Sequence, residues 1–302
     1  MVDLQNLRPK ELVWYLVIWF AFGISSVSAH PITVVPCWQV TFPAAAGGKA
    51  AESIAVPVEG QAMLVAIVAN GADASRPRLL LGNQPVATKV LGHDPVSRLE
   101  FLLIDDASQH SPLPWLREAG KYANASLTAQ TSAGPVSCRS TGWIKQVGGK
   151  VLPLALLRVS FDRPVPPPGT PLLTNEGSVV GILFQEAGAG NTAYAIPAEA
   201  VHRVQQDISK GGALVRGWLG LSLRADVRAP QVVRVLPDSP AAAAGTLPGD
   251  VLTSIGNRKI TEYADAANAF FYLIPGSPVR VKLLRGSQPL EFTLTPTRTA
   301  GK

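Results

Sequence analysis

The sequence has few of the side chains from which metal and redox sites are built. It contains 2 cysteines and 4 histidines in 302 residues, with no Cys-x-x-Cys pair and no Cys/His cluster. Charged residues make up only 16% of the chain and aromatic residues 7%. Basic and aromatic residues are not interleaved as they are on nucleic-acid-binding surfaces. We therefore expect no metal site, no cofactor and no nucleic-acid partner.

Glycine (27), proline (26) and apolar residues (47%) are abundant instead. This composition favours short strands joined by turns, and a chain of this length ordinarily forms about two domains. Between residue 31 and about residue 192, short apolar runs are bounded by turn residues. Examples are residues 63–68, 79–81, 101–104, 151–159 and 179–184. The pattern predicts an all-β sandwich or barrel.

A helix is predicted at the boundary between two domains. Residues 197–210 begin with Pro197, carry apolar residues at helical spacing and are followed by Gly211-Gly212. From residue 214 onward the chain is rich in predicted strands and contains one clear helix, residues 262–273, which ends before Pro275.

The first 29 residues predict an export signal. Arg8 and Lys10 form a basic start, residues 12–24 are apolar, and small residues precede a cleavage site after Ala29. The apolar stretch is too short to span a bilayer comfortably. The alternative is an uncleaved N-terminal membrane anchor; after cleavage, no membrane span is expected.

Export bears on Cys37 and Cys138, the two cysteines of the chain. In an oxidising compartment they can pair, and a bridge closing a loop of about 100 residues stabilises by up to about 4.7 kcal/mol. The alternative is two unrelated buried thiols.

The net charge of +6 is unevenly distributed. Residues 30–210 carry 14 basic and 13 acidic residues, whereas residues 211–302 carry 11 and 6, a net of +5. A positive C-terminal part suits an anionic partner such as a peptide carboxylate.

Three stretches of the C-terminal part resemble a PDZ domain. They are GWLGL (217–221), LPDSPAAAAGTLPGDVLTSI (236–255) and residues 260–276. Residues 211–302 are therefore identified as a PDZ domain, a five- to six-stranded partly open barrel with helices.

The PDZ resemblance implies a groove for peptide C-termini. Glycines at 217 and 220 let backbone N–H groups face a carboxylate with no Cβ in the way. The strand at 221–223 has an edge that an extended peptide can join, and the helix at 262–273 forms the other wall. The predicted peptide-binding residues are Trp218, Leu219, Gly220, Leu221, Leu223, Ala266, Ala269 and Phe270. The alternative is a PDZ domain packed on its own barrel or on a neighbouring subunit.

Three stretches of the N-terminal part resemble the HtrA/Deg (DegP-like) serine proteases. They are VEGQAMLVAIVANGA (58–72), residues 78–104, and GTPLLTNEGSVVGILF (169–184), which leads into TAYAIPAEAV (192–201). The resemblance implies a mainly β protein, in which a trypsin-like double β-barrel over residues 30–210 precedes the PDZ domain.

The same register places none of the family's catalytic groups in this chain. The family's histidine falls on Ile67, its aspartate on Arg98 and its serine on Pro168. One of the two oxyanion N–H groups falls on Pro168 and the other on Pro166, and proline has no N–H. The resemblance therefore implies a catalytically inactive member, a pseudoprotease.

Other catalytic arrangements find little support in the sequence. His93-Asp94 lies in a turn and indicates a solvated loop more than a catalytic dyad, and Thr170, two residues past the serine position, has no implied base. None of the histidines stands at metal-ligand spacing. The histidines are His30, His93, His110 and His202.

Three functions remain open at this point. The first is a peptide-binding adaptor or holdase for protein quality control in the bacterial periplasm or cell envelope. The second is a structural or regulatory subunit that forms homotrimers or joins an active HtrA protease. The third, least favoured, is a residual serine-type endopeptidase.

Overall fold

The computed structural model describes residues 38–188, 190–225 and 229–298, all within one compact unit that spans residues 35–302. The predicted signal segment and Cys37 lie outside the described residues. Among the residues that are described, no helix is long and apolar enough to cross a membrane.

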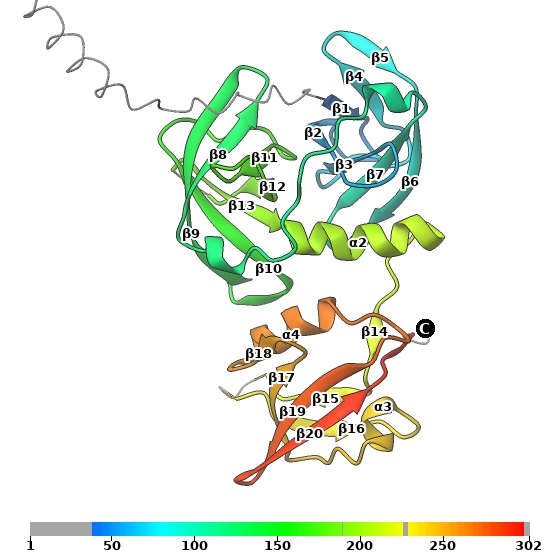
Figure 1. Ribbon diagram of the computed structural model, residues 1–302, viewed down its shortest axis with the longest axis vertical. Coiled ribbons are helices and arrows are strands. Elements are labelled where there is room, and N and C mark those ends of the chain that lie inside the picture. Colours follow the sequence, from blue (N-terminus) through cyan, green and yellow to red (C-terminus); the bar gives the residue numbers. More distant parts are fainter. Residues whose placement is uncertain (1–37, 189, 226–228, 299–302) are drawn as a thin grey trace, which may run out of the picture. The chain divides into compact units, whose positions relative to one another are not determined.

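The first seven strands form one antiparallel sheet in the order β5-β4-β1-β2-β3-β7-β6, which curls on itself (Figure 1). The strands are β1 (Trp38–Phe42), β2 (Ala51–Pro57), β3 (Met63–Ile67), β4 (Arg78–Leu81), β5 (Gln84–Val86), β6 (Thr88–Asp94) and β7 (Leu99–Ile104). All five residues of β3 are buried because its two faces enter different cores. Leu64 packs inside the curled sheet, and Val65 packs in the core shared with the second sheet.

The next six strands close into a barrel in the order β10-β13-β12-β11-β8-β9. The strands are β8 (Ser126–Thr131), β9 (Gly134–Val147), β10 (Lys150–Phe161), β11 (Pro171–Leu173), β12 (Val179–Glu186) and β13 (Thr192–Pro197). The 3₁₀ turns η1 (Ala107–Gln109) and η2 (Gly120–Tyr122) precede them. β10 contains a wide bulge: Val151 pairs with Gln146 and Leu156 with Ile144, so residues 152–155 stand opposite Lys145 alone.

Helix α2 (Ala198–Gly211) confirms the predicted boundary helix. It starts after Pro197 and ends at Gly212, whose left-handed backbone (φ 73°) lets its N–H bond to the Ile208 carbonyl. Val201, Val204 and Ile208 are buried between the two sheets.

The C-terminal domain follows α2. It contains β14 (Gly217–Trp218), β15 (Leu221–Leu223), β16 (Val232–Val235), α3 (Pro240–Ala243), β17 (Val251–Ile255), β18 (Arg258–Lys259), α4 (Tyr263–Phe271), β19 (Val279–Arg285), β20 (Gln288–Leu294) and β21 (Thr297–Arg298). The strands pair as β14-β21, β15-β16 and β18-β17-β19-β20. Helix α4 confirms the second predicted helix, and a reciprocal capping box between Glu262 and Asp265 starts it.

The mainly β prediction is confirmed, and the predicted runs become β3, β4, β7, β10 and β12. The two predicted barrels differ in closure. The second is closed, whereas in the described residues the first is a curled sheet whose edge strands, β5 and β6, do not pair with each other.

The Gly249-Asp250 turn of the C-terminal domain holds a buried carboxylate. Asp250 is 1% exposed and accepts hydrogen bonds from Arg285 Nε at 2.8 Å, Arg285 Nη2 at 2.9 Å and the Leu247 N–H at 2.9 Å. The Arg285 hydrogen bonds are the main cause that holds the pKa of Asp250 below its ordinary value of 3.8. Its stabilising effect is therefore present above that value and is lost as the pH falls through the lower folded pKa.

We predict that Asp250→Asn lowers the free energy of unfolding by about 1–3 kcal/mol at pH 7, because Arg285 loses its ionised acceptor. The difference from wild type should shrink as the pH falls below 3.8. Urea unfolding of both proteins at pH 7, 5 and 3 measures it. A difference as large at pH 3 as at pH 7 would contradict the assigned role of the charge.

Candidate functional site

The loop between β14 and β15 presents two free backbone N–H groups. Among the described residues, neither the Leu219 nor the Gly220 N–H donates to a backbone carbonyl. Their carbonyl oxygens accept from Ala241 and Leu236 at 3.0 and 2.9 Å, which anchors the loop. Gly220 is left-handed, with φ 81°. Free consecutive N–H groups in such a loop can bind a carboxylate.

Strand β15 has a free edge beside this loop. Within the described residues it pairs with β16 alone, with Leu221 opposite Val235. The neighbouring pair is hydrogen-bonded, because Leu236 donates to Gly220. Hydrogen-bonded and non-bonded pairs alternate in antiparallel sheets, so the main-chain groups of Leu221 point away from β16. An extended peptide can pair with them as an added strand.

The predicted groove residues differ in exposure. Trp218, Leu221 and Leu223 are half-buried, and Leu219 is 3% exposed. On α4, Ala266 and Ala269 lie in the domain core with at most 1% exposed, whereas Phe270 is half-buried at its edge. Of the three α4 residues, Phe270 is the one with surface to offer a ligand.

The loop glycines are required for packing. A Cβ on Gly220 would stand 2.1 Å from the Cβ of Ser239, and one on Gly217 would stand 2.7 Å from the Cβ of Leu273. This is a second reason for the glycines, beside the predicted access for a carboxylate. A side chain at either position would collide with the domain itself.

Two of the three positions that the family's register marks as catalytic, Ile67 and Pro168, are hydrogen-bonded to Ser53. Ile67, which is 1% exposed, donates its N–H to Ser53 Oγ at 3.2 Å. Ser53 Oγ in turn donates to the Pro168 carbonyl at 3.0 Å. The third position, Arg98, accepts the Val68 N–H at 2.9 Å, next to the paired residues Ile67 and Leu99. The serine hydroxyl thus bridges the two sheets.

Arg98 spans the same junction with its side chain. The guanidinium lies 3.8 Å from the centroid of the Phe184 ring, and Nη2 donates to Gln185 Oε1 at 2.7 Å. Both partners lie on β12 of the closed barrel, whereas Arg98 precedes β7 of the curled sheet. Arg98 holds a left-handed backbone (φ 58°) that is unusual for a residue other than glycine. Burial lowers its pKa.

The segment after the three prolines is packed tightly on β2. The Pro168 carbonyl accepts the Ile54 N–H at 2.7 Å, and a Cβ on Gly169 would stand 1.9 Å from the Ile54 oxygen. Thr170 is fully buried, and its hydroxyl donates to the Pro167 carbonyl at 2.7 Å. The Thr170 hydroxyl is thus occupied by a structural hydrogen bond.

The His93-Asp94 turn is not solvated, contrary to expectation. Asp94 is 3% exposed and accepts hydrogen bonds from Ser97 and Arg216. His93 Nδ1 lies 3.0 Å from Oε2 of Glu100, which is fully buried. Burial is the main cause that raises the pKa of Glu100, and His93 opposes it. The two neighbours therefore take different partners, and they form no dyad.

Cys138 is buried in the closed barrel, and burial raises the pKa of its thiol to about 12. Sγ donates to the Leu127 carbonyl at 3.5 Å. Because Cys37 lies outside the described residues, the disulfide remains a prediction.

Comparisons with known proteins agree with this architecture. The family model described as "PDZ domain" matches residues 217–295. The solved structure of the HtrA-type protease AlgW with a tripeptide superimposes with a TM-score of 0.63, covering 89% of this chain and 95% of that one at 20% identity. The chain is similar in fold to HtrA-type proteases: a trypsin-like fold followed by a PDZ domain.

Two curated relatives, both described as periplasmic endoproteases, are similar to this chain in sequence. The chain is 30% identical over 143 residues to the periplasmic pH-dependent serine endoprotease DegQ of Escherichia coli, covering 42% of this chain and 31% of that protein. It is 25% identical over 245 residues to a probable periplasmic serine endoprotease, DegP-like, of Chlamydia trachomatis, covering 71% and 47%. The chain thus spans between about a third and a half of the length of these relatives.

Sequence reasoning missed Ser53 and the partners of Arg98. Ser53 stands in no motif, and Phe184-Gln185 lies where the 169–184 stretch ends, which gave no reason to pair it with Arg98. Their roles arise from the contact between sheets, for which the linear pattern carries no signal.

We predict that Arg98→Ala lowers the free energy of unfolding by about 1–2 kcal/mol, because the stack on Phe184 and the bond to Gln185 are lost. The matched control is Arg139→Ala, an exposed arginine on β9, which should change stability by less than about 0.5 kcal/mol. Urea denaturation measures both variants. Equal losses would show that Arg98 does not join the two sheets.

Proposed function

We propose that this chain is an exported PDZ-containing pseudoprotease of the periplasm or cell envelope. It binds the C-termini or unfolded segments of other proteins and acts there as an adaptor, chaperone-like or regulatory subunit. The observation that carries the proposal is the free Leu219 and Gly220 N–H groups beside the free edge of β15.

Peptide capture follows from the chemistry of that loop. A terminal carboxylate accepts from the two N–H groups, and the peptide main chain pairs with the outward groups of Leu221. Half-buried Leu223 and Phe270 offer apolar surface to the last side chains. The net charge of +5 over residues 211–302 attracts an anionic terminus. AlgW, the structural neighbour, was solved with peptides bound.

Loss of proteolysis is the second half of the proposal. The Ile67 side chain cannot accept a proton as the family's histidine does. Arg98 is cationic where the register requires a carboxylate, and Pro168 has no nucleophilic atom in place of the serine hydroxyl. The prolines at 166 and 168 have no N–H with which to stabilise an oxyanion. The Ser53 bridge and the Arg98 stack occupy these positions with structural contacts. Peptide binding without cleavage follows.

We predict that the full exported chain binds peptides with an apolar last residue and a free carboxylate. Amidation of the terminus should weaken binding about tenfold or more, because charge-assisted hydrogen bonds are lost. Methylation of successive peptide amides should alternate between strong and weak effects, since every second N–H pairs with β15. Fluorescence anisotropy with labelled peptides measures both.

A matched pair of variants locates this site. Leu223→Ala should weaken binding, whereas Val233→Ala, which truncates a 44% exposed valine on neighbouring β16, should not. Equal affinity for free and amidated peptides would refute carboxylate capture and leave the domain as an assembly surface.

We predict that the chain neither cleaves unfolded casein nor reacts with a fluorophosphonate serine probe. Pro168→Ser alone should remain unlabelled, because Ile67, Arg98 and Pro166 still lack the base, its orienting carboxylate and one oxyanion donor. Mass spectrometry of the probe-treated protein reads the result, with an active trypsin-like protease as the positive control. Labelling of the single variant would show that the register of the catalytic positions is wrong.

A further inference from the structure

Helix α4 of the PDZ domain has two faces buried by different partners. Ala266, Ala269 and Leu273, just past its end, enter the core of the PDZ domain itself. Phe271, 4% exposed, enters the core that α2 shares with the two sheets. The helix that forms one wall of the proposed groove is therefore also packed against the closed barrel, chiefly on β10.

The bulge of β10 supplies the place where α4 packs. Because residues 152–155 stand opposite Lys145 alone, some of their backbone groups leave the strand ladder. The Ala155 N–H donates at 2.9 Å to Asn268 Oδ1 on α4. A side chain of the PDZ domain thus satisfies a backbone donor of the barrel.

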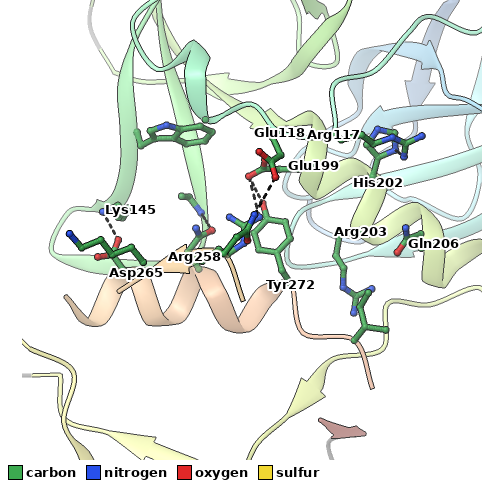
Figure 2. Close-up of a pocket in the computed structure, with 17 residues that line it drawn as sticks. Arg117, Glu118, Lys145, Glu199, His202, Arg203, Gln206, Arg258, Asp265 and Tyr272 are labelled. Carbon is green, nitrogen blue, oxygen red and sulfur yellow. Dashed lines mark hydrogen bonds and ion pairs between the residues drawn. The ribbon is translucent and has the colours of Figure 1, made fainter. Parts of the chain in front are cut away.

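Lys145 on β9 adds an ionic contact at the other end of α4. Its Nζ lies 2.6 Å from Asp265 Oδ1 and 3.2 Å from Glu262 Oε1, and Figure 2 shows it pointing toward Asp265. Burial lowers the pKa of Lys145, but hydrogen bonds to the two acids outweigh it and raise the net value. Burial likewise raises the pKa of Asp265, and the Lys145 and Thr261 bonds bring it below its ordinary value.

A cavity of about 570 Å³ lies between these contacts and α2. On one side of it, Arg258 stacks 3.5 Å from the Tyr272 ring centroid and pairs with Glu199 of α2 at 3.3 Å (Figure 2). The charges of Lys145 and Arg258 are neutralised within this wall. The cavity is therefore a polar gap in an interface, and we assign it no ligand.

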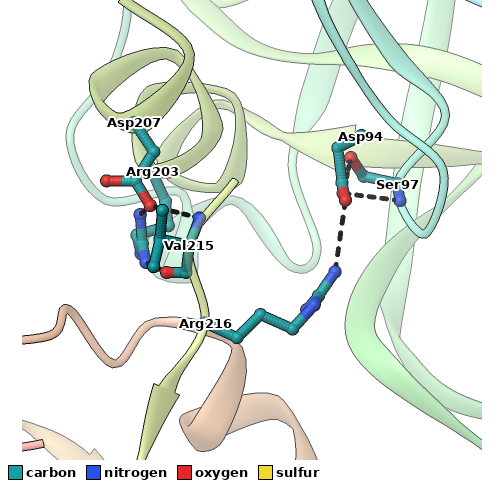
Figure 3. A network of polar contacts seen from close by, with 6 residues as sticks. All are labelled: Asp94, Ser97, Arg203, Asp207, Val215 and Arg216. Carbon is teal, nitrogen blue, oxygen red and sulfur yellow. Dashed lines mark hydrogen bonds and ion pairs between the residues drawn. The ribbon is translucent and has the colours of Figure 1, made fainter. Parts of the chain in front are cut away.

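Arg203 of α2 is hydrogen-bonded both to the segment that leads into the PDZ domain and to the residues just past α4. Its side chain is 3% exposed. Nη2 donates to the Val215 carbonyl at 2.8 Å and to the Leu273 carbonyl at 2.9 Å. Nη1 donates to Asp207 Oδ2 at 2.6 Å, which also accepts the Val215 N–H at 2.9 Å (Figure 3). One buried guanidinium thus holds both the linker and the end of α4.

Arg216 makes a second connection from the linker. It reaches Asp94 of β6 at 3.2 Å (Figure 3). Its guanidinium lies 5.5 Å from the Phe271 ring centroid. The segment between α2 and β14 is therefore attached to α2 at residue 215 and to the curled sheet at residue 216.

We infer that the barrel domain holds the PDZ domain in one docked position and, through α4, sets its affinity for peptide. Lys145 and Arg203 are then positioning residues for a groove that neither of them touches. The affinity part rests on the proposed peptide-binding function. If α4 is already ordered before the peptide binds, less conformational entropy is lost on binding. The affinity for peptide is then higher.

The test combines hydrogen–deuterium exchange of α4 amides with peptide anisotropy in the full exported chain. Lys145→Met removes the ammonium group of a side chain that is 32% exposed. Asp265 keeps its two hydrogen bonds from Thr261, so the variant should keep the fold. We expect it to speed exchange in α4 by roughly twofold and to weaken peptide binding by a similar factor. Lys150→Met, on the exposed end of β10, is the matched control and should change neither.

Arg203→Met should have a larger effect, at least about fivefold on both readouts. Arg158→Met, an exposed arginine of β10, is its control. Peptide should in turn slow α4 exchange in the wild type, because coupling is reciprocal.

The outcomes separate the docking inference from the proposed function. If the α4 amides of folded Arg203→Met and Lys145→Met exchange at the wild-type rate, the docked position is overturned. Faster exchange with unchanged affinity would overturn the control of affinity and leave peptide binding standing. A wild-type chain that binds no peptide would refute the proposed function and the affinity part, while the exchange result would still decide the docking.

Discussion

Burial of the apolar face of α2 between the two sheets is the interaction on which the rest of the structure depends. Val201, Val204 and Ile208 enter one core with β3, β12 and Phe271 of the PDZ domain. Each fully buried aliphatic side chain contributes about 1.5–3 kcal/mol. The opposite face of the same helix carries Glu199 and Arg203, which contact the PDZ domain. One helix therefore contacts both sheets and the PDZ domain.

The junction between the two sheets is held by hydrogen bonds and a cation–π contact. In a serine protease, this junction must stay open and polar so that a base, a nucleophile and an oxyanion can form. Here Ile67 is buried, the Ser53 hydroxyl bridges to Pro168, and Arg98 stacks on Phe184. Each contact favours a closed junction. The proposed loss of catalysis and these contacts between the sheets would then share the same residues.

Within the described residues, the PDZ domain has one free strand edge, on β15, and one helix, α4, that makes many contacts with the barrel. The edge of β15 leaves main-chain groups available, whereas α4 is packed on the barrel through a hydrogen bond, ion pairs and an aromatic ring. Polar contacts around a cavity hold a domain less tightly than a continuous apolar core would, since exposed pairs contribute at most about 1 kcal/mol each. The buried Arg203 network is the exception, and it lies where the linker and α4 meet.

The sequence by itself determined the class of fold, the two predicted helices and the predicted strands. Those features depend on local periodicity, on turn residues and on motifs with fixed spacing, all of which are visible along a linear chain. The closure of one barrel and not the other, the Ser53 bridge, the burial of Asp94 and the packing of α4 on β10 were decided by tertiary structure alone. Each joins residues far apart in the chain, as Ala155 and Asn268 are, through a single hydrogen bond or ring contact. Such a contact requires ordinary residue types at positions that only the folded backbone brings together.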